Sequence, residues 1–278
     1  CFNKDMIYTG YIKMEKQVDI LIIGAGISGI GLAVHLSKNC PQRKFEILER
    51  RDSFGGTWDL FRYPGIRSDS DMSTFGFNFK PWAKDKVLAS GAEIKGYLSD
   101  VINENQLKDK IHFGHRVLSA NYDSTKKKWI VEIEDNNKKK QIWSANFVMG
   151  CTGYYNYDQG YAPKFPKQED FKGQFIHPQH WPENLDYTGK KVVIIGSGAT
   201  AITLVPSMVK GGAGHVTMLQ RSPTYIATVP SIDFIYGKTR KFMSEEMAYK
   251  FTRARNIGMQ RGIYALAQKY PKKKRMGR

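Results

Sequence analysis

Cysteine is scarce in this sequence: the 278 residues contain three, Cys1, Cys40 and Cys151. No two of them form a CxxC pair, which argues against a disulfide scaffold, a zinc ribbon and a dithiol redox motif. The sequence also shows no evident secretory signal, and free thiols fit a reducing compartment. We therefore expect a cytoplasmic protein without a metal site.

Long hydrophobic runs are also rare. The one run of membrane-like length, residues 18–36, carries Asp19, four glycines, Ser28 and His35. These residues suit neither a transmembrane helix nor the apolar part of a signal peptide. Glycines at the junction of a strand and a helix explain the run better.

Acidic residues are too few to balance the basic ones: 43 Lys and Arg stand against 26 Asp and Glu, a formal charge of +17. The basic residues are scattered, and the groups at 126–128 and 138–140 flank a predicted strand. This distribution favours a solvated surface, so we expect no specific nucleic-acid partner. Peripheral contact with an acidic membrane surface stays open as an alternative.

Apolar segments alternate with turn residues in a way that predicts an α/β fold. A strand at 18–23, a helix at 27–38 and a strand at 44–49 make a βαβ unit, which implies a parallel sheet. A helix and three further strands, two of them alternating as an antiparallel pair, are expected at 93–104, 111–122, 128–134 and 146–151.

The opening pattern then returns, with a strand at 191–195, a helix to about residue 209 and a strand at 215–220. Two more helices are expected at 244–256 and 258–270. We therefore predict two Rossmann-like dinucleotide-binding domains with parallel sheets and a small antiparallel β insertion in the first. The expected boundaries are a leader at 1–16, the first domain at 17–153, a connecting segment at 154–189, a partial second domain at 190–270 and a basic tail at 271–278.

The first repeat carries a GxGxxG turn between its strand and helix. Gly24 permits the tight turn, Gly26 lets a pyrophosphate approach the backbone, and Gly29 allows close packing of helix and strand. Glu49 follows Gly29 by 20 residues, at the end of the next strand, where a carboxylate accepts both ribose hydroxyls. This pattern predicts FAD or NAD at the first turn.

The second repeat carries a GxGxxA turn, formed by Gly196, Gly198 and Ala201. Counting the same 20 residues from Ala201 gives Arg221, so a base stands where the first repeat has an acid. A guanidinium binds a 2′-phosphate through paired hydrogen bonds, which favours NADPH here and FAD at the first turn. Two such sites imply hydride transfer to flavin. Without a cysteine pair beside the flavin, the expected electron acceptor is oxygen.

Between the two turns, residues 171–182 read FKGQFIHPQHWP and match the pattern FxGxxxHxxxWP. This pattern resembles the fingerprint of class B, Baeyer–Villiger-type flavoprotein monooxygenases. The segments 54–59 and 62–69 resemble those of the subgroup that contains the ethionamide-activating monooxygenase, and the chain is also similar to the flavin-binding monooxygenases of long-chain alkane metabolism.

The resemblance implies a set of site residues. FAD is expected to contact Ser28, Glu49, Thr57, Trp58, Asp59, Leu60 and the backbone of Val117. NADPH is expected to contact Arg67, Ser68, Asp69, Gly196, Ser197, Gly198, Ala199, Thr200, Ala201, Ile202, Arg221 and Ser222. Asp69, near flavin and nicotinamide, and His177, which in the family couples domain motion to hydride transfer, are the implied catalytic residues.

The implied activity is insertion of one oxygen atom from O2 into a hydrophobic substrate (a ketone, a sulfide or an alkane-derived compound) through a peroxide at flavin C4a. The family's catalytic arginine is expected beyond Arg278, which predicts a C-terminally truncated chain. Two alternatives follow: an NADPH oxidase or flavin reductase, and a non-catalytic nucleotide-binding remnant.

Overall fold

The computed structural model describes residues 14–222, 224, 226, 228 and 230–270. The predicted basic tail and most of the predicted leader lie outside these residues. Within the described part of the chain, no helix has both the length and the apolar character needed to cross a bilayer.

The chain divides into two compact units. The first combines Cys1–Leu60 with Lys95–Gln159, and the second combines Phe61–Ile94 with Gly160–Arg278. Residues 61–94 thus belong with the later half of the chain, although the sequence assigned them to the first domain.

Close backbone packing explains why residues 61–94 join the second unit. A Cβ atom on Gly65 would lie 2.1 Å from Ser207 Oγ, so the loop lies directly on the helix that carries Ser207. Farther along, Arg253 donates hydrogen bonds to the backbone carbonyls of Ser73 and Thr74 at 2.7 and 3.1 Å. The boundary follows these contacts, which no sequence pattern displays.

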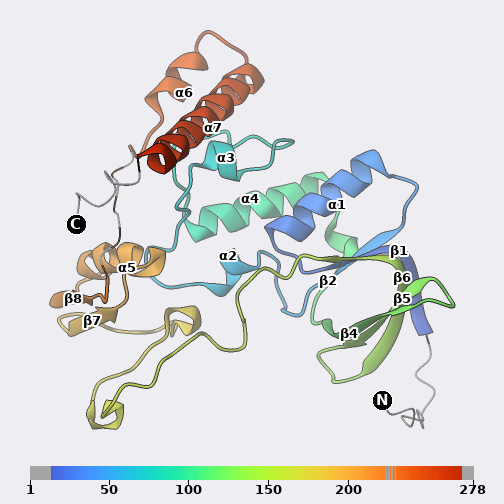
Figure 1. Cartoon of the computed structure of the whole chain (residues 1–278), viewed down its shortest axis with the longest axis horizontal. Coiled ribbons are helices and arrows are strands. Elements are labelled where there is room, and N and C mark those ends of the chain that lie inside the picture. The colour runs from blue at the N-terminus through green and yellow to red at the C-terminus, as the bar shows by residue number, and fades with distance from the viewer. Residues whose placement is uncertain (1–13, 223, 225, 227, 229, 271–278) are drawn as a thin grey trace. The chain divides into compact units, whose positions relative to one another are not determined.

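A six-stranded sheet forms the centre of the first unit, in the order β3-β2-β1-β6-β5-β4. Its four adjacent strands β3, β2, β1 and β6 run parallel, and β5 and β4 extend it as antiparallel strands. The bounds are β1 Met14–Ile23, β2 Phe45–Leu48, β3 Ile111–His112, β4 Arg116–Asp123, β5 Lys128–Glu134 and β6 Lys140–Gly150. The predicted antiparallel portion is confirmed as an extension of the same sheet (Figure 1).

The core of the first unit lies where the parallel and antiparallel strands meet. Val18 and Leu21 from β1 pack with Val131, Ile133 and other buried side chains of the sheet. On α1 (Ile27–Asn39) the buried residues are small or aliphatic, among them Gly29, Ile30 and Ala33. The glycine turn therefore directly follows a strand that is packed into this core, at the carboxyl end of β1.

The second unit contains a two-stranded parallel sheet of β7 (Lys191–Ile195) and β8 (His215–Leu219), connected by α5 (Ala199–Lys210). The predicted second βαβ unit is therefore confirmed. The remaining helices are α2 Thr57–Leu60 in the first unit, α3 Met72–Phe75, α6 Phe234–Thr239 and α7 Glu245–Lys269 in the second, and α4 Gly91–Glu104.

Three predicted elements need correction. Strand β1 begins at Met14, inside the predicted leader. The predicted strand 111–122 is two strands, because Gly114 between them has a φ of +66° and turns the chain. The two predicted helices at 244–256 and 258–270 are one helix, α7, since Gly258 lies in a helix interior at a tolerable cost of about 1 kcal/mol.

Candidate functional site

A pocket of about 460 Å³ opens at the carboxyl ends of β1, β2 and β6 in the first unit. Its volume lies within the range of about 300–1,000 Å³ that is typical of small-molecule sites. The carboxyl edge of a parallel sheet is where Rossmann folds bind nucleotides. The lining comes from residues 23–28, 48–50, 55–58, 115–117 and 151–157.

The glycine turn at the floor of this pocket has no room for side chains at two of its three glycines. Gly24 has a φ of +108°, and a Cβ there would lie 2.5 Å from the Cys151 carbonyl oxygen. A Cβ on Gly29 would lie 1.9 Å from the Gly24 carbonyl oxygen. At Gly26 the nearest atom would be 3.7 Å away, so that position stays open toward the pocket. This is the cradle expected around a pyrophosphate.

The amino terminus of α1 points its backbone N–H groups at this cradle. Its N-cap residue Gly26 makes no side-chain cap hydrogen bond, and no acidic residue stands in the first turn. Ser28 is exposed in that turn. The positive end of the helix dipole and the N–H groups of the first turn therefore suit an anionic group.

Glu49 lies at the end of β2, beside the glycine turn, and is 5% exposed. One carboxylate oxygen accepts a hydrogen bond from the Ala25 backbone nitrogen at 2.8 Å, and the other accepts from the Arg51 backbone nitrogen at 3.0 Å. A carboxylate has about four acceptor positions, so these two bonds leave room for two ribose hydroxyls. The acid is thus held in a fixed orientation at the pocket.

The segment 54–59 closes against the glycine turn. Gly55 donates its N–H to the Ala25 carbonyl at 2.9 Å, and a Cβ on Gly56 would lie 3.2 Å from Gly26 Cα. Thr57 and Trp58 line the pocket. These contacts place the predicted flavin-contacting segment directly opposite the turn.

Two predicted FAD contacts lie outside the lining. Asp59 is 3% exposed, and its carboxylate is paired with Arg51 at 2.8 Å and with Lys95. Leu60 does not line the pocket either, whereas Ser28, Glu49, Thr57, Trp58 and Val117 do. These two ion pairs hold Asp59 within the segment that carries Thr57 and Trp58.

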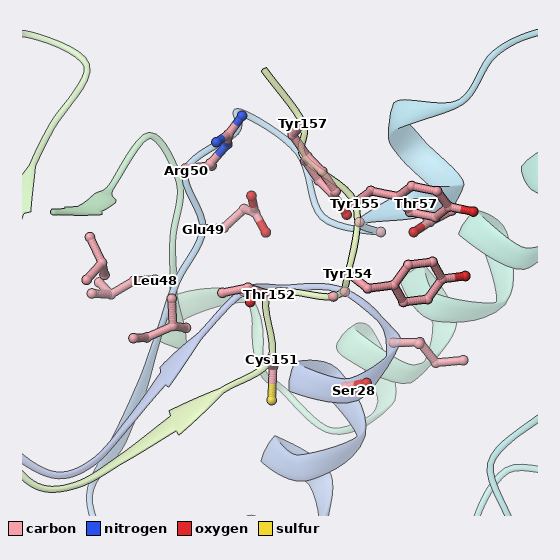
Figure 2. Close-up of a pocket in the computed structure, with 18 of the residues that line it drawn as sticks. Ser28, Leu48, Glu49, Arg50, Thr57, Cys151, Thr152, Tyr154, Tyr155 and Tyr157 are labelled. Carbon is pink, nitrogen blue, oxygen red and sulfur yellow. The ribbon is translucent and has the colours of Figure 1, made fainter. Parts of the chain in front are cut away.

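One wall of the pocket is aromatic. Tyr154, Tyr155 and Tyr157, which the sequence analysis placed in a connecting segment, line the pocket beside Glu49 and Thr57 (Figure 2). Burial raises the pKa of the Tyr157 phenol, and it also raises the pKa of the Cys151 thiol below it. The sequence signal for this wall is the cluster of tyrosines at 154–161, which directly follows the strand end at Gly153.

The second glycine turn repeats the geometry of the first. Gly24 donates its N–H to the Leu48 carbonyl at 2.8 Å, and Gly196 donates to the Leu219 carbonyl at the same 2.8 Å. Gly196 has a φ of +134°, and Gly198 is the N-cap of α5 without a side-chain cap. A Cβ on either glycine would meet nothing within 4 Å. The described second turn is thus open to an anionic ligand.

The strand register corrects one detail of the second site. Glu49 directly follows Leu48, so its structural equivalent is Gln220, which directly follows Leu219. Arg221 occupies the next position and, like Ser222, is exposed. The count of 20 residues was off by one because the crossover from the turn to the end of β8 is one residue shorter. The second site therefore pairs a neutral amide with an adjacent guanidinium.

The segment 62–69 lies in the second unit, on α5. Arg67 and Asp69 are exposed. Ser68 is 1% exposed, and it exchanges hydrogen bonds with Ala89, whose N–H donates to Ser68 Oγ at 3.1 Å. Arg67 and Asp69 thus belong to the same unit as the second turn, while Ser68 ties their loop to its neighbour.

His177 belongs to the second unit and is not among the residues that line the first-unit pocket. It caps the short helix Pro178–His180, accepting the Gln179 backbone N–H on Nδ1 at 3.2 Å. A Cβ on Gly160 would lie 2.1 Å from the His177 ring. These contacts fix the ring against the start of the connecting segment. In the described ranges, no group of three or more His, Cys, Asp or Glu residues is arranged to hold a metal ion.

Comparison with protein families matches residues 15–231 to the FMO-like family, described as flavin-binding monooxygenase-like. The chain belongs to this family. It is 97% identical over 259 residues to the probable FAD-binding monooxygenase AlmA of an Acinetobacter species, covering 93% of this chain and 52% of that protein. It is 53% identical over 258 residues to the FAD-containing monooxygenase EthA of Mycolicibacterium smegmatis, covering 93% and 52%.

Among solved structures, an oxidized steroid monooxygenase bound to NADP matches with a TM-score of 0.69 and 28% identity, covering 84% of this chain and 43% of that one. The chain spans about half the length of the curated relatives it matches. The predicted resemblance to flavin monooxygenases is confirmed.

Proposed function

We propose that the first-unit pocket binds FAD, that the second turn binds NADPH, and that the chain carries these sites for a monooxygenase acting on a hydrophobic small molecule with O2. The observation that carries the proposal is the buried Glu49 carboxylate fixed beside a glycine turn and an uncapped helix amino terminus. In a dinucleotide site, a carboxylate binds the ribose hydroxyls, and a glycine turn with a helix amino terminus binds the adjacent pyrophosphate.

Support for FAD at the first turn comes from the fit of the residues present. The bare Gly26 backbone and the α1 N–H groups would hold the pyrophosphate, and Glu49 would hold the ribose hydroxyls. Ser28, Thr57 and Trp58 would contact the remaining flavin nucleotide, with the Val117 backbone near the adenine. Two of the relatives are named as FAD-binding or FAD-containing monooxygenases.

Support for NADPH at the second turn comes from the change of charge at the strand end. Gln220 replaces the acid that would repel a 2′-phosphate, and Arg221 offers a bidentate partner for it. The turn itself, residues 196–202, would hold the pyrophosphate, with Ser222 beside the 2′-phosphate. The similar steroid monooxygenase structure is bound to NADP.

Bound flavin supplies the redox chemistry, accepting a hydride from NADPH and passing electrons to O2. The protein's part is to hold the two nucleotides and orient them. We propose Asp69, with Arg67 and Ser68, as contacts that position the nicotinamide, and His177 as a residue that couples hydride transfer to movement of the connecting segment. The His177 ring packs on Gly160 and accepts the Gln179 N–H, and both residues belong to the segment 154–189, so a movement of that segment would carry the ring with it.

A visible spectrum of the purified chain, loaded with FAD and then mixed with NADPH without oxygen, tests the proposal. A flavin band that bleaches on NADPH addition supports both sites. A stable FAD complex that NADPH does not reduce leaves the nucleotide-binding remnant as the better description. If the flavin is reduced and each NADPH then yields one hydrogen peroxide in air, without substrate oxygenation, the chain acts as an NADPH oxidase.

The setting we propose is the cytoplasm, with peripheral contact at an acidic membrane surface. The net charge of +17 supports such contact. On α6 and in the loop that follows, Phe234 is 71% exposed and Phe242 is 87% exposed, with Lys238 and Lys241 nearby. Co-sedimentation with vesicles containing phosphatidylglycerol, but not with pure phosphatidylcholine vesicles, is the expected result.

A further inference from the structure

We propose that Tyr157 and Asp158, with their partners Thr57 and Arg50, form a clasp across the first-unit pocket that slows the release of FAD. This inference rests on the proposed FAD site. It assigns a retaining role to a segment that lies between the sheet of the first unit and the unit boundary after Gln159.

The first half of the clasp is an ion pair at the pocket mouth. Arg50 directly follows Glu49, and its guanidinium donates two hydrogen bonds to the Asp158 carboxylate, at 3.1 and 2.7 Å. A second cation, Arg116, lies 3.9 Å from the same carboxylate. Hydrogen bonding from Arg50 holds the pKa of Asp158 below its usual range. Such two-point contacts fix geometry better than a single-point pair does.

The second half of the clasp is the phenol ring of Tyr157. The Arg50 guanidinium lies 5.5 Å from the ring centroid, and the phenol is hydrogen-bonded to the Thr57 side chain. A Cβ on Gly56 would lie 3.2 Å from the Tyr157 hydroxyl, so the hydroxyl reaches the segment opposite the glycine turn. Figure 2 shows Tyr157 and Arg50 on the same side of Glu49, above the turn.

The amino-terminal end of the segment 151–158, which carries Tyr157 and Asp158, is anchored as well. The Cys151 backbone nitrogen donates to the Ile23 carbonyl at 2.8 Å, next to the glycine turn. Only a few residues separate this bond from the Asp158 pair, and Asn156 holds the bend by accepting the Asp158 N–H at 3.0 Å. A short segment with both ends fixed forms a wall, and a ligand behind it leaves only when one anchor opens.

The charges at this mouth suit an anionic dinucleotide. Arg50 and Arg116 line the pocket, and Asp158 neutralises part of their charge while the clasp is closed. Tyr157 can offer its hydroxyl to a phosphate or ribose oxygen at the same place. The clasp therefore contributes to retention more than to the initial capture of FAD, which the open turn controls.

The test compares Asp158→Asn and Tyr157→Phe with Asp123→Asn, a change in another exposed, hydrogen-bonded carboxylate of the same unit. The rate of FAD release is measured from the rise in free-flavin fluorescence after dilution of the FAD complex into flavin-free buffer. Backbone hydrogen exchange of residues 152–158 is measured without FAD. The melting temperature of each variant is recorded, because a purely structural effect would lower it without changing the release rate selectively.

We expect Asp158→Asn to raise the FAD release rate by about fivefold, the upper end for breaking one solvent-exposed ion pair, and to speed exchange in 152–158. Tyr157→Phe should raise the release rate by about threefold, while Asp123→Asn changes neither quantity. Unchanged release and unchanged exchange in Asp158→Asn would overturn the clasp. If the unaltered chain binds no FAD, the proposed function fails and the retaining role fails with it, whereas wild-type FAD binding with unchanged release in both variants refutes the clasp alone.

Discussion

The Glu49 carboxylate accepts the backbone N–H of Ala25 at 2.8 Å, and this bond joins the end of β2 to the glycine turn after β1. The acid that we propose for the ribose therefore also fixes the turn that would hold the pyrophosphate. The two parts of a dinucleotide would be positioned by one side chain. Changing that side chain should weaken nucleotide binding more than it weakens the fold.

Glu49→Gln tests this dual role. The amide keeps one oxygen for the Ala25 N–H but loses the negative charge and one acceptor, so the ribose hydroxyls lose charge-assisted hydrogen bonds worth about 1.5–3 kcal/mol. We expect FAD affinity to fall by about 10-fold to 100-fold in fluorescence titrations. The matched control is Glu132→Gln. Glu132 lies on β5, forms an ion pair with Lys140 and is not part of the pocket lining. Equal FAD affinity in the two variants would refute the ribose role.

The glycines of the first turn allow a paired experiment. Ala favours a helix over Gly by about 1 kcal/mol, so Gly29→Ala would stabilise α1 if space allowed. However, the new Cβ would lie 1.9 Å from the Gly24 carbonyl oxygen, and this clash turns the expected gain in stability into a loss. We expect Gly29→Ala to lower the free energy of unfolding by about 2 kcal/mol or more, the scale of overpacking in a tight core.

Gly26→Ala is the partner of that experiment. Its Cβ meets nothing closer than 3.7 Å, and its backbone φ of −80° suits any residue. The melting temperature should stay near that of the unaltered chain, while FAD binding is lost because the methyl group occupies the pyrophosphate approach. A Gly26→Ala protein that binds FAD normally would show that the pyrophosphate lies elsewhere.

The parts predicted correctly from the sequence are those where a local pattern and the tertiary structure agree. The apolar run at 18–23 and the glycines at 24–29 are enough to predict the strand, the turn and the start of the helix from local sequence. The equivalence of Gln220 and Glu49 could not be predicted, because it depends on a one-residue difference in crossover length. Tyr157 lacked any periodic context, so only the folded chain shows that it faces Thr57. The predicted FAD contact Asp59 is buried and paired with Arg51, a long-range contact that the sequence does not display.

The corrected register gives a sharper test of coenzyme choice. Arg221→Gln removes the proposed partner of the 2′-phosphate, and the affinity for NADPH should fall by about 10-fold to 100-fold while that for NADH stays unchanged. Gln220→Glu places an acid at the equivalent of Glu49, which should repel the 2′-phosphate and favour NADH. Isothermal titration with both coenzymes measures each constant, with Lys210→Gln at the far end of α5 as the control. If NADPH keeps its advantage in both variants, the strand end does not select the coenzyme.

Helix α4 begins with a reciprocal cap that predicts a pH dependence. The Glu93 N–H donates to Ser90 Oγ at 3.3 Å, and the Ser90 N–H donates to the Glu93 carboxylate at 2.9 Å. The hydrogen bond from Lys86 lowers the pKa of Glu93 to about 2, with burial opposing and the Ser90 N–H assisting. Because the pKa of Glu93 in the folded chain lies below its ordinary value of 4.5, this carboxylate stabilises the fold fully above pH 4.5 and progressively less as the pH falls toward 2.

Two variants separate the charge of this cap from its geometry. Ser90→Ala should cost about 1 kcal/mol at pH 7, which lowers the melting temperature by about 2–4 °C in a chain of this size. Glu93→Gln should also lower the melting temperature at pH 7. Its difference in melting temperature from the unaltered chain should shrink as the pH falls from 4.5 toward 2, because the unfolded natural chain takes up a proton at Glu93 that the folded chain binds only near pH 2. Circular dichroism melts across that range decide the matter. If the difference in melting temperature between Glu93→Gln and the unaltered chain stays constant with pH, the charge of Glu93 beside Lys86 contributes nothing to stability.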